Sequence, residues 1–230
     1  MAPPNLPNLI LIDGLPGSGK STTGLRLVER LHSLGVEATG YGETDADHPL
    51  HVVPPQPDSA AWEDIHLRMG PEEFYAKSLG NWRTFLAGLG SKTAVLESYP
   101  FQSAARVLLQ MDASPALLDA FMTEWAAGVA GIPTMLIYFE EADTDGLCRA
   151  AMAHRGSEWS RMMIEAFAQM PYAANRGLSG ESAVFRLIRD YAVWMDSAAA
   201  RGLVTTHRFP ARPADYEARQ AAVERALGVR

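Results

Sequence analysis

The chain has 230 residues, of which 47% are hydrophobic and 20% are charged, and its formal net charge is −7. This length and composition are ordinary for one α/β domain with a sizeable hydrophobic core. The acidic balance argues against a protein that binds bulk nucleic acid or an anionic membrane surface, because both polyanions attract basic proteins.

Two features bear on the compartment. Cys148 is the only cysteine, so no intrachain disulfide can form, which fits a reducing cytoplasm. No stretch approaches the roughly 18 apolar residues of a membrane span, and the first apolar run, which stops at Asp13, is too short for a signal peptide. We therefore expect a cytoplasmic protein without a membrane segment.

The first predicted element is a buried strand over residues 9–13, and a helix that ends near Gly35 follows the next loop. The loop reads G-x-x-x-x-G-K-S, from Gly14 to Gly19, Lys20 and Ser21. This is the complete phosphate-loop (Walker A) pattern, placed between a strand and a helix as that motif requires. The alternative is a glycine-rich turn without a ligand.

Each residue type in this loop suits a triphosphate. Glycines let main-chain N–H groups turn toward phosphate oxygens, and the positive end of the helix dipole points the same way. Lys20 would bridge the β- and γ-phosphates, and the Ser21 hydroxyl would ligate Mg²⁺. The predicted nucleotide-binding residues are Gly14, Pro16, Gly17, Ser18, Gly19, Lys20, Ser21 and Thr22.

An acidic turn follows the second predicted strand, residues 36–41. It contains Glu43, Asp45 and Asp47, and it lies at the carboxyl end of a strand, where open α/β sheets bind ligands. Phosphoryl transfer to an alcohol needs a carboxylate that accepts the hydroxyl proton, so Asp45 and Glu43 are candidate bases. A solvated acidic turn is the alternative.

A proline-rich stretch, residues 49–60, leads into a helical stretch over about 58–90, which breaks at Gly70-Pro71. Its large apolar residues fit helical spacing and indicate core packing, a cover over the substrate, or direct stacking on a ligand. These residues are Phe74, Leu79, Trp82, Phe85, Leu86 and Leu89.

The third predicted strand, residues 92–97, ends on Glu97, which could hold Mg²⁺ or direct a nucleophile. Gln102 and Arg106 follow one helical turn apart, within a predicted helix at 101–111, as substrate contacts or as a surface pair. Asp13 directly precedes the loop and could touch Mg²⁺, position a substrate hydroxyl, or brace the loop.

After a helix at 114–130 and a fourth strand at 134–139, residues 140–170 read as a helical lid interrupted at Gly156. Its arginines could neutralise the transferring phosphoryl group, or only complement a helix C-terminus. They are Arg149, Arg155 and Arg161, of which Arg155 and Arg149 are favoured.

The remaining elements are a helix at 181–200, a short strand at 204–206 and a terminal helix at 213–227. Arg208 and the loop at 210–213 follow the last strand, where a nucleotide base could lie. The histidines have no zinc-ligand spacing. Alternating strands and helices predict a parallel sheet with helices on both faces.

On the phosphate loop, the acidic turn, Glu97 and the later arginines, the chain resembles the small phosphate-loop kinases. The resemblance implies an α/β three-layer αβα sandwich with a five-stranded parallel sheet. It also implies a mobile lid, at about 140–170. Because no linker divides the chain, we expect one domain over 1–230, with a substrate-side insertion at about 58–90. The expected reaction is Mg²⁺-dependent transfer of the γ-phosphate of ATP or GTP to a small-molecule hydroxyl.

Three departures shape the expected acceptor. Glu97-Ser98 stands where deoxynucleoside kinases have Asp-Arg or Glu-Arg, and the lid lacks a clean R-x-x-x-R. The helical stretch at 58–90 is also large for a shikimate-type kinase. We therefore expect a bulkier hydroxylated acceptor, such as an antibiotic or a nucleoside-like metabolite. The chain is also compatible with a homodimer.

Two alternatives stay open. A nucleoside or nucleoside monophosphate kinase would use a second basic pocket, for which Arg68, Arg83 and Arg106 are available. A nucleotide-switched NTPase or binding protein would hydrolyse NTP without an acceptor, although no GTPase switch or guanine-reading motif is evident.

Overall fold

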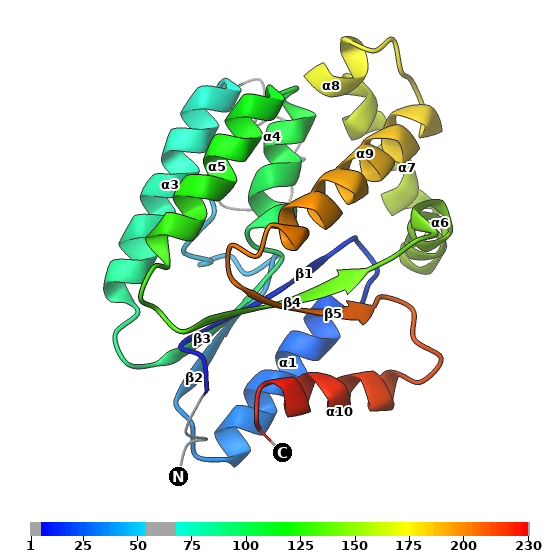
Figure 1. Ribbon diagram of the computed structural model, residues 1–230. Coiled ribbons are helices and arrows are strands. Elements are labelled where there is room, and N and C mark those ends of the chain that lie inside the picture. Colours follow the sequence, from blue (N-terminus) through cyan, green and yellow to red (C-terminus); the bar gives the residue numbers. More distant parts are fainter. Residues whose placement is uncertain (1–5, 54–67, 230) are drawn as a thin grey trace.

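The computed structural model describes residues 6–53 and 68–229 (Figure 1). Its centre is a sheet whose five strands are all parallel, in the order β2-β3-β1-β4-β5. The strands are β1 (Leu9–Gly14), β2 (Ala38–Tyr41), β3 (Thr93–Glu97), β4 (Thr134–Glu140) and β5 (Thr205–Pro210). This confirms the predicted five-stranded parallel sheet.

β1 is buried along its whole length because it runs between β3 and β4 and is covered on both faces. The register places Ile12 beside Glu97 and Gly14 beside Phe139. The carboxyl ends of the central strands therefore reach one edge of the sheet together, and that edge is where the phosphate loop begins.

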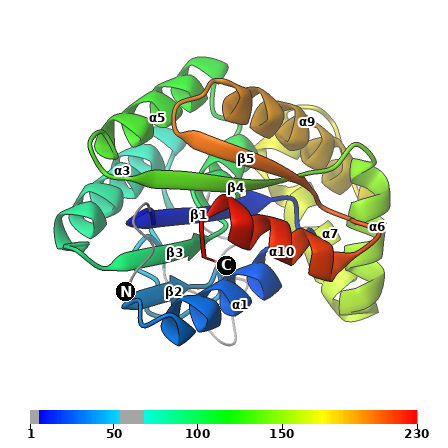
Figure 2. The same cartoon turned by 60° about the horizontal axis from the view of Figure 1, so that its bottom comes forward.

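Helices cover both faces of the sheet (Figures 1 and 2). One layer holds α1 (Lys20–Ser33) and α10 (Tyr216–Ala226), which are joined by an ion pair between Arg26 and Glu217. The opposite layer holds α3 (Pro71–Gly88), α4 (Arg106–Gln110), α5 (Pro115–Gly128) and α9 (Glu181–Ala200). These layers make the expected three-layer arrangement.

The remaining helices lie beyond the carboxyl end of β4. They are α6 (Thr144–Arg155), α7 (Ser157–Gln169) and the short α8 (Pro171–Ala174). The break between α6 and α7 falls at Gly156, whose φ of 92° suits glycine, as the sequence predicted. Within the two described ranges, no helix combines the length and apolar content needed to cross a membrane.

Several element boundaries differ from the sequence prediction, among them the start of β2, which is Ala38 instead of Val36. β5 extends to Pro210 instead of ending near 206. The prediction was too short because this edge strand has no continuous apolar run by which its end could be recognised. α10 begins at Tyr216 instead of Pro213, where the Asp215 side chain accepts from the Ala218 amide. The predicted helix at 101–111 opens as a π-helical turn, η1 (Phe101–Ala105), before α4.

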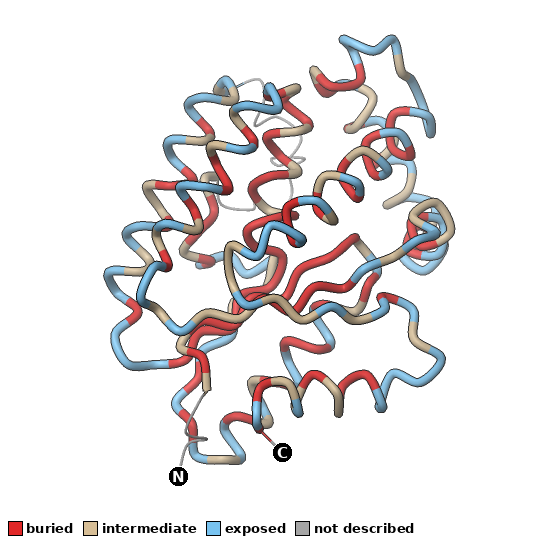
Figure 3. The backbone as a smooth tube through the Cα atoms, viewed as in Figure 1, coloured by how far each residue is buried: buried red, intermediate tan, exposed pale blue. Residues whose placement is uncertain are grey.

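Buried residues line the central strands and the inner faces of α3, α5 and α9 (Figure 3). Trp82 of α3 is fully buried, stacks on Trp125 at 5.9 Å and donates to its carbonyl oxygen. Phe74 and Leu79 are also buried. These α3 residues thus pack in the core, while the part of the predicted insertion at 58–67 lies outside the described residues.

Candidate active site

The phosphate loop joins β1 to α1 through residues with unusual backbone geometry. Gly14 has a φ of 151°, and a Cβ atom there would lie 2.7 Å from the Phe139 carbonyl oxygen. Gly19 caps α1 with a φ of 89°, and a Cβ atom there would lie 2.6 Å from Nη2 of Arg219. Both positions therefore require glycine for conformation and for space.

The loop residues differ in accessibility. Pro16 and Ser21 line a cavity beside the loop, whereas Ser18 is buried and its Oγ has no hydrogen-bond partner within residues 6–53 and 68–229. Gly17 and Thr22 are exposed. α1 begins at Lys20 directly after the loop, so its N-terminus lies at the loop, and the N-terminus of a helix is suited to bind phosphate.

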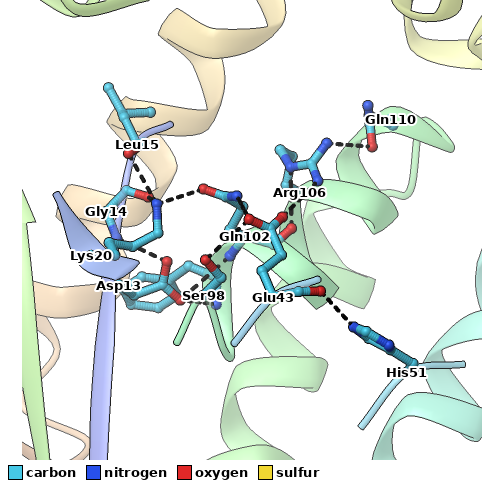
Figure 4. A network of polar contacts seen from close by, with 11 residues as sticks. Asp13, Gly14, Leu15, Lys20, Glu43, His51, Ser98, Gln102, Arg106 and Gln110 are labelled. Atoms are coloured by element: carbon cyan, nitrogen blue, oxygen red, sulfur yellow. Dashed lines mark hydrogen bonds and ion pairs between the residues drawn. The ribbon is translucent and has the colours of Figure 1, made fainter. Parts of the chain in front are cut away.

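Lys20 is buried and its ammonium group is fully engaged (Figure 4). Nζ donates to the carbonyl oxygens of Gly14 at 3.0 Å and Leu15 at 3.1 Å, and to Oε1 of Gln102 at 2.8 Å. Burial lowers the pKa of Lys20, and the nearby carboxylates of Glu43, Asp13 and Glu97 oppose that effect.

Ser21 and Glu97 lie together at the mouth of the loop. The Ser21 hydroxyl donates to Oε1 of Glu97 at 2.6 Å, and both residues line the cavity. Among the described residues there is no cluster of three or more His, Cys, Asp or Glu that could hold a metal. Mg²⁺ typically binds one or two protein oxygens plus substrate phosphates and water, so this pair fits that ion.

Asp13 is fully buried, and its hydrogen-bond donors among the described residues are all main-chain amides. The donors are Gly14 at 2.8 Å, Phe101 at 2.7 Å and Gln102 at 3.4 Å. Burial raises the pKa of Asp13 to about 7, although Lys20 and these amides oppose that effect. Asp13 does not line the cavity. Of the roles left open by the sequence, the geometry fits bracing of the loop against η1.

The two candidate bases of the acidic turn lie in different surroundings. Glu43 lines the cavity, where its carboxylate accepts from Nε2 of Gln102 and lies 3.8 Å from Arg106. Asp45 is exposed and accepts from the Gly42 amide at 2.7 Å, so it caps its own turn. Of these two acids, only Glu43 lines the cavity and can contact a molecule bound there.

Neighbouring groups stabilise the ionised form of the Glu43 carboxyl group. Burial raises the pKa of this carboxyl group, but Arg106, Lys20 and the hydrogen bond from Gln102 together outweigh burial. Its pKa therefore lies below the ordinary value, and Glu43 is ionised at neutral pH.

Gln102 and Arg106 both line the cavity, from η1 and the start of α4. Nε of Arg106 donates to the Gln102 carbonyl oxygen at 3.2 Å, and Nη1 donates to Gln110 at 3.2 Å. The guanidinium is thereby held on the cavity wall beside Glu43.

The three lid arginines point in different directions. Arg155 lines the cavity and lies over the Trp159 ring at 4.6 Å. Arg149 lies over the Phe185 ring of α9 at 4.3 Å, and Arg161 pairs with Glu165 in an exposed position. Arg155 alone of the three lines the cavity.

The cavity has a volume of about 370 Å³ and a lining of two chemical kinds. Polar and charged side chains, among them Ser21, Glu43, Glu97 and Arg106, form one part of the lining, and an apolar wall forms another. That wall comes from α4, α7 and the residue before α8, and it consists of Val107, Trp159, Met162, Met163, Ala166, Phe167 and Met170.

Sequence reasoning missed this wall. Its α7 residues follow a helical spacing of three and four, which was a usable signal for a one-sided apolar face. The pattern alone does not say whether such a face meets the core or a cavity.

Sequence reasoning also missed Arg219 of α10, which is buried against the loop. Its Nη1 donates to the carbonyl oxygens of Ser18, Pro210 and Ala211, and its guanidinium lies over the Phe139 ring at 4.1 Å. Burial lowers the pKa of Arg219. A residue so far along the chain gives no local signal of this contact.

Three further arginines lie outside the cavity lining. Arg83 pairs with Glu124 on the surface, Arg68 is exposed, and Arg208 pairs with Glu140. The structure therefore does not bring Arg68 and Arg83 together with Arg106 in a second basic pocket at this cavity.

Two kinases are among the solved structures that resemble this chain. A thymidylate kinase from Ehrlichia chaffeensis has 12% sequence identity and a TM-score of 0.53, over 96% of this chain and 97% of that one. A deoxyadenosine kinase from M. mycoides with bound dATP has 14% identity and a TM-score of 0.47, over 96% and 99%.

No model of a known protein family and no curated protein sequence matches the chain. At such low identity, the likeness to the thymidylate kinase concerns the fold alone. Together with the parallel sheet and the phosphate loop, it confirms the expectation from sequence: the chain has the fold of the small phosphate-loop kinases.

Proposed function

We propose that this protein transfers the γ-phosphoryl group of a Mg²⁺-bound nucleoside triphosphate to a hydroxyl group of a small molecule held in the cavity. One observation carries the proposal. The same cavity is lined by Ser21 and Glu97 at the phosphate loop and by Glu43 and Arg106 beside an apolar wall. A donor phosphate and an acceptor hydroxyl can therefore meet within it.

The residues divide the chemistry as follows. Lys20 and the loop amides bind the β- and γ-phosphates, and Ser21 and Glu97 hold Mg²⁺. When bound, Mg²⁺ neutralises charge on the phosphate oxygens. Arg155, which lines the cavity, stabilises the negative charge of the transferring group.

Glu43 orients the acceptor hydroxyl and accepts its proton. The hydroxyl oxygen forms a bond to the γ-phosphorus, and the bond from that phosphorus to the bridging oxygen breaks, which leaves the nucleoside diphosphate. Glu43 is ionised at neutral pH, so it is ready to take the proton.

The lining favours an acceptor with an apolar or aromatic body. The carboxylates of Glu43 and Glu97 balance Arg106 and Arg155, which suits a neutral molecule, and the α7 wall would pack against its body. A nucleoside has this form. The thymidylate kinase with a similar fold supports a nucleoside or nucleotide acceptor, whereas no described residue favours an antibiotic.

A nucleoside monophosphate is the second candidate. Arg106 and Arg155 are the observation in its favour, because both guanidinium groups line the cavity and could bind a phosphate. The two candidates differ in whether the acceptor brings its own negative charge.

The test is phosphoryl transfer from γ-labelled ATP or GTP to a panel of nucleosides, nucleoside monophosphates and hydroxylated aromatic compounds, with Lys20→Ala as the control. Label in a nucleoside supports the first candidate, and label in a monophosphate supports the second. Label found only in NTP and inorganic phosphate would contradict both and would favour a nucleotide-switched NTPase.

A further inference from the structure

The side chain of Gln102 lies between the two most important charges of the candidate site (Figure 4). Its Oε1 accepts from the Lys20 ammonium group at 2.8 Å, and its Nε2 donates to the Glu43 carboxylate. One amide therefore bridges the cation that faces the donor phosphates and the acid that faces the acceptor.

The contact with Lys20 competes with phosphate binding. An ammonium group has three N–H donors, and those of Lys20 are all used, by two main-chain carbonyls and by Gln102. To donate to a phosphate oxygen, Lys20 has to give up one of these acceptors. Gln102 is the acceptor that can move most easily, because it alone belongs to a side chain.

The contact with Gln102 is the shortest that the Glu43 carboxylate makes with a side chain of the described residues. The Ser98 hydroxyl lies 3.4 Å away and Arg106 lies 3.8 Å away, both farther than the Gln102 amide. A change in the position of Gln102 therefore changes the position and the proton affinity of Glu43.

The rest of Gln102 is fixed, so that motion is limited to its side chain. The residue is 5% exposed. Its main-chain N–H donates to Asp13, and its main-chain carbonyl oxygen accepts from Arg106. The orientation of the side-chain amide is set by charge, with its oxygen toward the cation and its nitrogen toward the anion.

We propose that Gln102 is a positioning residue that couples donor binding at Lys20 to the Glu43 carboxylate. When a phosphate oxygen replaces Gln102 as an acceptor for the Lys20 ammonium group, the Gln102 side chain moves and its hydrogen bond to Glu43 weakens. The Glu43 carboxylate can then orient the acceptor hydroxyl. Coupling of this kind is reciprocal, so a change at Glu43 alters donor affinity through Gln102. The inference rests on the proposed function for the roles of Lys20 and Glu43.

The test is a double-mutant cycle on donor binding, measured by calorimetry with a nonhydrolysable ATP analogue and Mg²⁺. The variants are Gln102→Leu, Glu43→Asp and both together. Glu43→Asp keeps the charge but shortens the side chain, so it breaks the contact with Gln102. Gln220→Leu is the matched control, because Gln220 is a buried glutamine of α10 that bonds to Glu224 instead.

We expect Gln102→Leu to tighten analogue binding by roughly three- to tenfold, because Lys20 loses a competing acceptor. A merely structural residue would weaken binding when removed. Glu43→Asp should tighten binding in the wild-type background and change it by less than about twofold in the Gln102→Leu background, as coupling through that amide requires. Gln220→Leu should leave the affinity unchanged.

Equal effects of Glu43→Asp in both backgrounds, no effect in either, or weaker binding by Gln102→Leu would overturn the inference while leaving the proposed function standing. Gln102→Met, which keeps the side-chain length, replaces Gln102→Leu if the latter fails to fold. Absence of analogue binding by the wild-type protein would instead overturn the proposed function, and the inference with it.

Discussion

Nη1 of Arg219 donates a hydrogen bond of 2.9 Å to the carbonyl oxygen of Ser18, although the two residues are 201 positions apart. The C-terminal helix α10 therefore supports the phosphate loop through a side-chain hydrogen bond to the loop backbone. The same nitrogen contacts the carbonyls of Pro210 and Ala211, so the loop is tied to the end of β5 as well.

Arg219→Met should weaken ATP binding and destabilise the fold. It leaves buried carbonyl oxygens without a donor, at a cost of about 1–3 kcal/mol for each group left unsatisfied. Calorimetry with an ATP analogue and thermal unfolding measure the two effects. Arg225→Met, at an exposed position of the same helix, is the control. Equal behaviour of the two variants would show that Arg219 does not shape the loop.

Glu97→Gln should lower the Mg²⁺ dependence of nucleotide affinity. The Ser21–Glu97 pair offers the cation a hydroxyl and a carboxylate, and the substitution removes the negative charge while keeping the shape. We expect an ATP analogue to bind about tenfold more weakly with Mg²⁺, as for loss of a charged contact of roughly 1.4 kcal/mol, and little differently without it. A titration with and without Mg²⁺ decides, and a loss that is equal in both would argue against a metal role.

Trp159→Ala should raise the KM for the acceptor and leave ATP affinity unchanged. The substitution removes part of the apolar wall and the ring on which Arg155 lies. We expect an increase of roughly tenfold in KM, since an aromatic side chain that packs against a ligand contributes about 1–2 kcal/mol of contact. Steady-state kinetics with an acceptor from the panel measure it, and Val193→Ala, at an exposed site of α9, is the control. An unchanged KM would place the acceptor elsewhere.

His48→Asn should make the protein less sensitive to acid. His48 stacks on His51 at 4.6 Å, and burial, reinforced by His51, lowers the pKa of His48 to about 4, although Asp45, Glu43 and Asp47 oppose this. Its contribution to stability is therefore complete above pH 6.5 and is lost as the pH falls toward 4, by at most about 3 kcal/mol. Asparagine keeps an acceptor for the Leu50 amide but does not titrate.

The measurement is the free energy of unfolding in urea from pH 4 to pH 7, for the variant and the wild type. The difference between them is needed because Asp13 acts in the opposite direction. Its raised pKa of about 7 makes the folded state bind a proton that the unfolded state releases, so stability falls as the pH rises toward 7. A difference between the two proteins that does not change with pH would contradict the titration of His48.

The phosphate loop and the sheet could be predicted because both are local patterns. Eight residues from Gly14 to Ser21 define the loop, and runs such as Leu9 to Ile12 define buried strands. The choice between Glu43 and Asp45 could not be made in this way. Two acids two positions apart carry the same signal, and the Gly42 amide turns one of them into a cap.

Contacts between distant segments were equally beyond sequence reasoning. Arg219 resembles any arginine of a terminal helix until the end of β5 and Ser18 surround it. The α7 wall was readable as an amphipathic face, but its partner was not, because the same spacing serves a core and a binding cavity.

Much of the α7 wall is methionine, at Met162 and Met163, with Met170 beside it. Methionine has an unbranched, flexible chain and a polarisable sulfur, so such a wall adjusts to the outline of whatever lies against it. We therefore expect a graded acceptor preference. The protein should phosphorylate several molecules of different shape, each at a different rate, instead of a single compound.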